Sequence, residues 1–324
     1  MIAVDKPIDG PSVWTRRDVR AEDYLLELSP LCFDEIRRAV DEIGTFPLPA
    51  ILRGPDDFTM PACRRAMNQV RQILDHGRRF AIVDRLPVAE MNGEEATAIY
   101  WLLSSMVSRP VAQKLDGTMI YDVLDTGQQA LPGSGIRPDK TNIEIRFHND
   151  NAYNDTPPDY VGLLCLRQAQ SGGHSRVISF HTAHNLLLAR HQSQLERLYQ
   201  PFWFDRQREY HPGEQPVFAA PVFESREALA RFSVHQSAAG TRSRVSRLTR
   251  MARRQSRRCS TFSRTMTSRS ISTWSPDRSS SCTTGPSAIA VRLLSMIRSP
   301  TAGGISSGCG CATMAAVPIP AEAR

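Results

Sequence analysis

The sequence lacks a long apolar stretch, and its first residues lack a basic segment followed by an apolar run. A membrane-spanning helix needs about 18 or more consecutive apolar residues, and no such run occurs. The opening residues MIAVDKPIDG do not have the pattern of an export signal. These absences predict a soluble cytoplasmic protein with no membrane partner.

Cysteine pairs with the CxxC spacing of a zinc site are also missing. The 324 residues include seven cysteines, and none of them forms such a pair. In a reducing compartment isolated cysteines are expected to be free thiols rather than a disulfide framework. Neither a zinc site nor a disulfide-stapled fold is therefore expected.

Acidic residues are scarce in the last 88 positions. Residues 237–324 hold 14 Arg, no Lys and only Asp277 and Glu322, which gives this segment a charge of +12. The preceding 236 residues hold 26 basic and 31 acidic side chains, so the net charge of +7 belongs to the tail alone. A basic tail can bind nucleic acid through phosphates, but this one has few aromatic residues to stack on bases.

Helical and alternating apolar patterns fill the chain up to about residue 236. Expected strands crowd together after residue 117 without a helix between each pair, which favours an α+β or mainly β fold over a doubly wound sheet. The patterns predict helices over 29–44, 59–77, 92–110 and 182–200, and strands over 79–87, 117–127, 141–148, 159–168 and 175–181.

The tail shows neither pattern. It contains 18 Ser beside its 14 Arg, a composition typical of a disordered segment. A shifted reading frame explains the same composition. In that frame each original codon consists of the last base of one present codon and the first two bases of the next. A Ser codon that begins with TC then supplies the middle T of a Leu, Ile, Val or Phe codon. Recoding in that frame, with permitted synonymous choices, produces strand and helix patterns and the strings GHRRTAF and GRHLLRLRLR. We therefore predict that 237–324 is an out-of-frame, disordered tail.

A histidine and an aspartate two residues apart follow the expected strand at 141–148. On an extended segment His148 and Asp150 point to the same side. An imidazole and a carboxylate so placed can supply two ligands of a 2-His-1-carboxylate iron site, which leaves positions open for a co-substrate and O2. The pair alone is a weak signal, since an ordinary polar turn can have the same composition.

The surrounding stretch FHNDNAYNDTPPDYVGLLCLRQAQSGGHSRVISFHTAHNLL resembles the TauD/TfdA family of Fe(II)- and 2-oxoglutarate-dependent dioxygenases. The common pattern is the HxD pair, a Pro-Pro, a Leu-rich strand and a Gly-Gly-x-Ser segment that ends at Ser175. The resemblance covers about residues 30 to 236. It implies a double-stranded β-helix, a jelly-roll-like core flanked by helices, which would here be incomplete at the C-terminus.

The resemblance also implies roles for particular residues. His148 and Asp150 would bind iron, and the Ser175 hydroxyl would contact the co-substrate 2-oxoglutarate. Asn149, Asn151 and Tyr153 lie beside the ligands and could line a substrate pocket. Their interpretation as turn and strand-edge residues stays open. The chemistry of the family couples oxidation of 2-oxoglutarate to oxidation, usually hydroxylation, of a small organic substrate by O2.

Two groups of the family pattern are missing from the chain. The third iron ligand is a His near the C-terminus, and an Arg beyond it pairs with 2-oxoglutarate, but no His follows His235. The recoded strings contain both, and the codon of the His would lie under Ala288 and Ile289. Two ligands hold iron less firmly than three, so we expect weak iron binding, poor folding and little turnover.

The sequence thus divides into an N-terminal extension at 1–28, a truncated dioxygenase domain at 29–236 and the tail at 237–324. Its preferred function is an Fe(II)/2-oxoglutarate-dependent dioxygenase acting on a small organic molecule. Two alternatives stay open: a catalytically inactive pseudoenzyme or small-acid binding module, and a nucleic-acid binder that uses the basic tail. The identity of the substrate and the oligomeric state are not defined by the sequence.

Overall fold

The computed structural model describes residues 6–129, 138–143, 145–167, 169, 174–224, 229–233, 236–238, 240, 288–292, 296–299 and 311–317. The helices are α1 (Pro30–Thr45), α2 (Pro61–His76), α3 (Gly93–Val107), α4 (Phe180–Arg190) and α5 (Gln192–Leu198). The strands are β1 (Leu25–Glu27), β2 (Phe80–Asp84), β3 (Arg109–Val111), β4 (Ile120–Val123), β5 (Tyr160–Cys165), β6 (His174–Val177), β7 (Phe202–Asp205), β8 (Val217–Ala220), β9 (Phe223–Glu224), β10 (Leu229–Ala230), β11 (Ala288–Arg292), β12 (Met296–Ser299) and β13 (Cys311–Val317). Short 3-10 helices occur at Ala21–Asp23, Ala50–Leu52, Pro55–Asp57, Val88–Glu90 and Pro138–Lys140.

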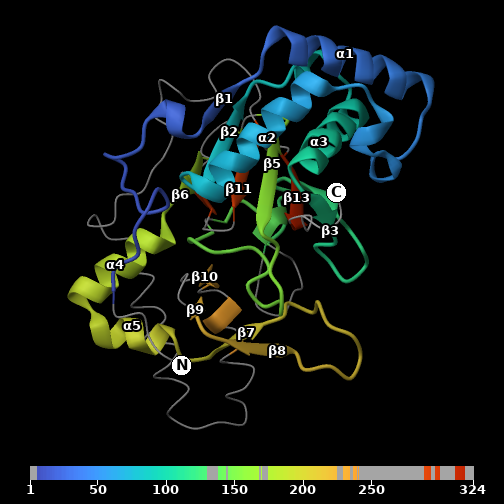
Figure 1. Ribbon diagram of the computed structural model, residues 1–324. Coiled ribbons are helices and arrows are strands. Elements are labelled where there is room, and N and C mark those ends of the chain that lie inside the picture. Colours follow the sequence, from blue (N-terminus) through green and yellow to red (C-terminus); the bar gives the residue numbers. More distant parts are fainter. Residues whose placement is uncertain are drawn as a thin grey trace.

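Local sequence signals set the ends of the three N-terminal helices. The Ser29 hydroxyl caps α1 by accepting from the backbone N–H of Cys32. Helix α2 ends at Gly77, where an added Cβ would lie 2.7 Å from a backbone oxygen of the last turn. Asn92 caps α3 by accepting from two backbone N–H groups of the first turn. The three helices lie together at one end of the molecule, and their apolar faces pack with the sheet in the largest core (Figure 1).

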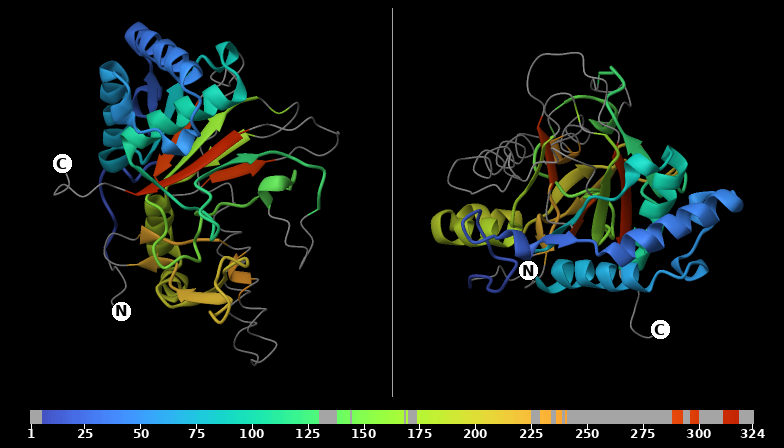
Figure 2. Two further views of the ribbon diagram at one scale, coloured as in Figure 1. Left: turned by 90° about the vertical axis from the view of Figure 1, so that its right-hand side faces the viewer. Right: turned by 90° about the horizontal axis from the view of Figure 1, so that it is seen from above.

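The largest sheet has seven strands in the order β1-β2-β11-β5-β13-β3, with β4 also paired to β13. The β1–β2 pair is parallel and the other pairs are antiparallel. Strand β5 lies at the middle of the sheet, and four of its six residues are buried. Three two-stranded sheets, β10–β9, β12–β6 and β7–β8, and one isolated bridge make up the rest of the pairing among the described residues (Figure 2).

Three strands lie in the region for which a disordered tail was predicted. In β11, Ile289 pairs with Ile82 of β2 on one side and with Leu163 of β5 on the other. Strand β13 lies along the opposite edge of β5, and β12 pairs with β6. Backbone N–H and C=O groups make these ladders, so a segment of weak strand composition can occupy the position between β2 and β5.

The prediction of disorder therefore does not hold for β11, β12 and β13. Of the remaining tail residues, only 237, 238 and 240 belong to the part of the chain that the structure describes. The boundaries of the proposed regions and the shifted frame stay predictions.

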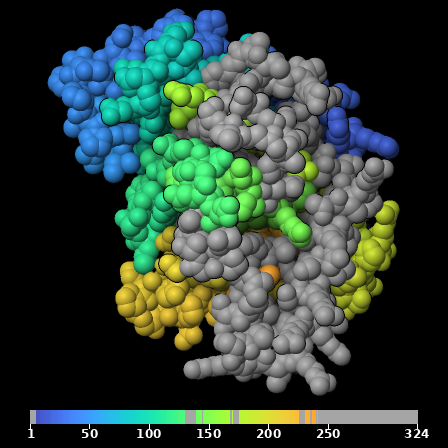
Figure 3. Space-filling view, turned by 180° about the vertical axis from the view of Figure 1, so that it is seen from behind, coloured from blue at the N-terminus to red at the C-terminus, as the bar shows by residue number. Residues whose placement is uncertain are grey.

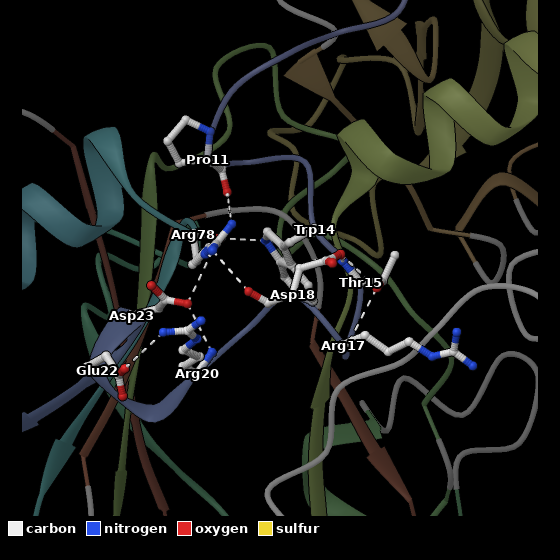
Figure 4. Close-up of polar contacts among 9 residues, drawn as sticks. All are labelled: Pro11, Trp14, Thr15, Arg17, Asp18, Arg20, Glu22, Asp23 and Arg78. Atoms are coloured by element: carbon white, nitrogen blue, oxygen red, sulfur yellow. Dashed lines mark hydrogen bonds and ion pairs between the residues drawn. The ribbon is translucent and has the colours of Figure 1, made fainter.

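The N-terminal segment is part of the fold from residue 6 onward. Strand β1 pairs with β2, and the Trp14 ring lies 5.3 Å from that of Phe80 in a small third core. The Trp14 indole N–H donates to the carbonyl of Arg78 at 2.9 Å. The Arg78 guanidinium in turn donates to the carbonyls of Pro11 and Asp18, which fastens this segment against the end of α2 (Figure 4).

A second core lies at the other end of the molecule, beneath α4 and α5. It joins these helices to strands β7, β8 and β9 and includes Phe147, Tyr153 and Phe232. Seen from behind, residues of the N-terminal helices lie at upper left and those around β7 and β8 at lower left, so the two cores occupy opposite ends (Figure 3). The segment that holds the predicted iron ligands packs on this second core.

Most of the predicted elements are present, with two exceptions. The expected strand at 141–148 is no strand in the part that the structure describes; it contributes one antiparallel bridge, between His148 and Ser233. The expected helix at 182–200 is two helices, because the backbone at His191 leaves the helical conformation. No helix within the described segments combines the length and the apolar character needed to cross a bilayer.

Candidate functional site

The predicted HxD pair comes together at the surface end of the second core. His148 Nε2 lies 3.1 Å from Asp150 Oδ1, and the two side chains are 21% and 34% exposed. Both groups are therefore partly shielded but within reach of an ion or a small molecule. An imidazole nitrogen and a carboxylate oxygen at this separation can bind one cation together.

The backbone selects which nitrogen of His148 faces Asp150. His148 Nδ1 lies 2.8 Å from the carbonyl oxygen of Arg146. A carbonyl oxygen only accepts, so Nδ1 carries the hydrogen and Nε2 is the nitrogen that faces the carboxylate. Metal-binding histidines are commonly oriented in this way, by a hydrogen bond from the nitrogen that does not bind the metal.

The residue between the two ligands fixes the segment to its neighbour. Asn149 is 2% exposed, its backbone N–H donates to the carbonyl of Phe232 at 2.7 Å, and its Oδ1 accepts from the Phe232 N–H at 2.9 Å. The side chain thus replaces one bond of a strand ladder. These contacts are those of a positioning residue rather than of a side chain that faces a substrate.

The two other predicted pocket residues form the turn after the ligands. Asn151 has a left-handed backbone with φ 50°, its carbonyl accepts from Asn154 N–H at 2.9 Å, and its Oδ1 accepts from the Tyr153 hydroxyl at 3.2 Å. Asn is among the residues that tolerate this conformation best. The Tyr153 side chain is buried in the second core. Both residues therefore contribute to the shape of the turn.

Ser175, the predicted 2-oxoglutarate contact, lies in β6 and is half-buried. The next residue, Arg176, places its guanidinium carbon 6.0 Å from the centre of the Phe147 ring. Phe147 directly precedes His148, so β6 runs beside the segment that carries the HxD pair. The placement of Ser175 at a 2-oxoglutarate site and the role of its hydroxyl stay predictions.

Two further histidines are buried in structural contacts. His181 Nδ1 lies 2.7 Å from the Ser12 hydroxyl, and His184 Nε2 lies 2.9 Å from the Tyr199 hydroxyl. Burial lowers the pKa of His184, while its bond to Asn185 opposes this change. Both side chains are buried, because the N-terminal segment covers His181 and Tyr199, next to α5, covers His184.

No third metal ligand accompanies the pair in the described part of the chain. Within these segments no group of three or more His, Cys, Asp or Glu side chains is arranged to hold a metal ion. His235, the last histidine of the sequence, lies outside the described residues. The observed donor set is therefore one imidazole and one carboxylate.

Sequence reasoning missed the segment that supports the pair. Arg231, Phe232 and Ser233 are all buried, and each contacts the stretch from His148 onward. The only available signal was an arginine between apolar neighbours in LARFSV. An arginine rarely becomes fully buried unless it has partners, and those partners are distant in sequence.

A strand-rich core flanked by helices, together with an imidazole–carboxylate pair, is the arrangement typical of the class of non-haem iron oxygenases. The chain belongs to the taurine catabolism dioxygenase TauD, TfdA family, which matches residues 45–264. Members of this family are Fe(II)- and 2-oxoglutarate-dependent dioxygenases. The match begins within α1 and extends 28 residues past the predicted boundary at 236.

Relatives of known activity or structure agree with this assignment. FR-33289 synthase of Streptomyces rubellomurinus (strain ATCC 31215) is 27% identical over 219 residues, which cover 67% of this chain but only 63% of that protein. A structure of asparagine oxygenase with Fe(II), 2S,3S-3-hydroxyasparagine and succinate superposes with a TM-score of 0.57 at 16% identity, covering 91% of this chain and 94% of that one. The non-haem iron oxygenase OrfP, solved with Fe and alpha-ketoglutaric acid, gives 0.56 at 12% identity over the same shares. The two structural similarities establish the fold.

Proposed function

We propose that the site of this chain is the iron site of a 2-oxoglutarate-dependent dioxygenase that hydroxylates a small organic molecule with O2, and that His148 and Asp150 are two of its iron ligands. The observation that carries the proposal is the 3.1 Å separation of His148 Nε2 and Asp150 Oδ1, with Nδ1 bonded to the carbonyl of Arg146. The structures of asparagine oxygenase and OrfP hold hydroxylated amino acids, 2S,3S-3-hydroxyasparagine and (3S)-hydroxy-L-Arg. A small polar organic acid is the corresponding substrate class here.

His148 and Asp150 provide the types of ligand atom that Fe(II) binds. Among the described residues they are two ligands where the iron site needs three. Imidazole nitrogen and carboxylate oxygen are the ligands of the 2-His-1-carboxylate site. The missing ligand would be the histidine that the shifted frame restores at Ala288 and Ile289. Since metal affinity depends on ligand count and geometry, the chain as it stands is expected to hold iron weakly.

The chain's own residues orient the ligands and shield them. When bound, iron would supply the activation of O2 and of 2-oxoglutarate. The Arg146 carbonyl holds the His148 ring in one orientation, and Asn149 fixes the backbone between the ligands to Phe232. Ser175 is the proposed hydroxyl contact to 2-oxoglutarate.

We further propose that the strands form the two layers of an incomplete double-stranded β-helix. In support, β5, β11 and β13 pair in the large sheet, whereas β6 and β12 pair in a separate small one. The chain thus passes from the large sheet to the small one and back, first from β5 to β6 and later from β11 through β12 to β13. This alternation is what a jelly-roll-like fold requires.

The test compares the present chain with one whose frame is restored after Gln236. Both are purified without oxygen, loaded with Fe(II) and assayed for succinate release from 2-oxoglutarate. The restored chain should turn over, and H148A or D150A in it should abolish the activity, whereas H76Q at the exposed end of α2 should not. Activity that survives both H148A and D150A would exclude these residues as ligands.

A second candidate function is a pseudoenzyme that binds a small acid without catalysis. It is favoured by the lack of a third ligand in the described residues. Calorimetric titration with 2-oxoglutarate separates the two functions. Binding that requires a divalent metal supports the dioxygenase, and equal binding without metal supports the pseudoenzyme.

A further inference from the structure

We propose that Arg231 is a positioning residue for the iron site: its guanidinium clamps the turn that follows Asp150 and thereby sets the geometry of the HxD pair. This inference rests on the proposed iron role of His148 and Asp150. It adds a residue more than 75 positions away in sequence that no ligand pattern includes.

The clamp consists of bonds from one buried side chain to the turn. The Arg231 side chain is 6% exposed. Its Nη1 donates to the carbonyls of Ala152, at 3.0 Å, and of Asn154, and its Nη2 donates to that of Asp155 at 3.1 Å. Its Nε donates to Glu224 Oε1 at 2.9 Å, which balances the charge. Four bonds in a planar fork leave the turn little freedom to shift.

The two residues after Arg231 contact the segment that carries the proposed iron ligands. Phe232 exchanges two hydrogen bonds with Asn149, and Ser233 forms the bridge with His148. Three consecutive residues, Arg231 to Ser233, therefore hold the segment from His148 to Asp155 along its length. The arginine secures the end of this segment, where Asp150 enters the turn.

The clamp is itself anchored in the second core. The Arg231 N–H donates to the carbonyl of Val222 at 2.7 Å, and the Phe232 ring packs edge-on against Phe180 at 5.6 Å. The Arg231 guanidinium also lies 5.2 Å from the centre of the Phe218 ring. The position of the turn thus depends on the core beneath it, and a substitution at Arg231 should act on the ligands without contacting them.

The decisive variants are R231K and R231Q. R231K keeps the positive charge but lacks the planar guanidinium, and R231Q lacks both. A matched control is R78Q, because Arg78 makes the same kinds of contact, to two carbonyls and the Asp23 carboxylate, on the N-terminal segment rather than on the turn after Asp150 (Figure 4). Amide hydrogen exchange of 150–156 reports on the turn. Titration with Co(II), followed by its ligand-field absorption bands, reports on the ligands in the full chain.

Amide hydrogen exchange in 150–156 should be about tenfold faster in R231K and R231Q than in wild type, since these variants lose hydrogen bonds to the backbone carbonyls of the turn. Co(II) should bind about 10–100-fold more weakly, as expected when a group that orients ligands is lost, and its absorption bands should move. R78Q should instead accelerate exchange around 11–23 and leave the Co(II) spectrum unchanged. If R231Q fails to fold, R231K alone decides.

Two results would overturn the inference, and they are distinct from failure of the proposed function. Unchanged exchange in 150–156 would show that Arg231 does not hold the turn. Faster exchange with an unchanged Co(II) affinity and spectrum would show that the clamp does not reach the ligands. A wild-type chain that binds no Co(II) at all would overturn the iron role of the pair itself, and the exchange data would then still decide whether Arg231 holds the turn.

Discussion

Asn149 shows how a single buried amide can support a site without facing its ligand. Its Oδ1 accepts from the buried Phe232 N–H at 2.9 Å. N149A leaves that N–H without its acceptor and should lower the free energy of unfolding by about 1–3 kcal/mol in urea titrations. N142A, at an exposed position just upstream, should change it by less than about 0.5 kcal/mol. Equal effects of the two substitutions would contradict the role assigned to Asn149.

His184 makes the stability of the fold depend on pH. Burial lowers its pKa in the folded chain, so the unfolded chain takes up the proton first as the pH falls. This contribution to stability is complete above the unfolded pKa of about 6.5 and decreases as the pH falls below it toward the folded pKa. Thermal melts at about pH 7.5 and about pH 5.5 should differ more for wild type than for H184Q. The same pH dependence in both would show that His184 is not responsible.

At the scale of elements, the end of α2 depends on a residue without a side chain. A Cβ at Gly77 would lie 2.7 Å from the carbonyl oxygen of Ile73, a backbone atom that cannot turn aside. G77A should therefore destabilise the protein by about 1–3 kcal/mol, measured by chemical unfolding. Gly93, at the start of α3, has open space around it, so G93A should leave stability equal or raise it by up to about 1 kcal/mol. A neutral G77A would show that the helix end can shift.

Helices α1, α2 and α3 were predictable from sequence because their signals are local. Caps such as Ser29 and Asn92 satisfy the first N–H groups of a helix whatever the rest of the chain does. The segment 141–148 was not predictable as irregular, since its alternating pattern is that of a strand. Within its described part it makes one bridge, between His148 and Ser233.

At the scale of the whole molecule, the last strands complete the large sheet. The partners of β5 among the described residues are β11 and β13. A chain that ends at residue 236 would leave both edges of β5 without backbone partners, so it should lose its cooperative thermal transition and aggregate. A chain that ends at residue 317 keeps all the described strands and should melt as the full chain does. A cooperative melt of the shorter chain, followed by circular dichroism, would show that the sheet is complete without the tail.

Some features of the candidate site depend on residues close in sequence and others on residues far apart. That His148 and Asp150 lie close together could be predicted from sequence, because they are only two residues apart; their role as iron ligands stays a proposal. The support from Arg231, Phe232 and Ser233 could not, since more than 75 residues separate it from the ligands. Contacts of that kind leave no periodic signal in a single sequence.

The sequence by itself determined the family pattern, the HxD pair, the approximate ends of α1, α2 and α3, and the absence of a histidine beyond His235. The tertiary structure alone decided that residues 6–28 pack against the rest of the described chain, that His181 and His184 are buried, and that β11 and β13 flank β5. The physical reason is the range of each interaction. Caps, turns and alternation act within a few residues, whereas burial and strand pairing depend on which distant segments the folded chain brings together.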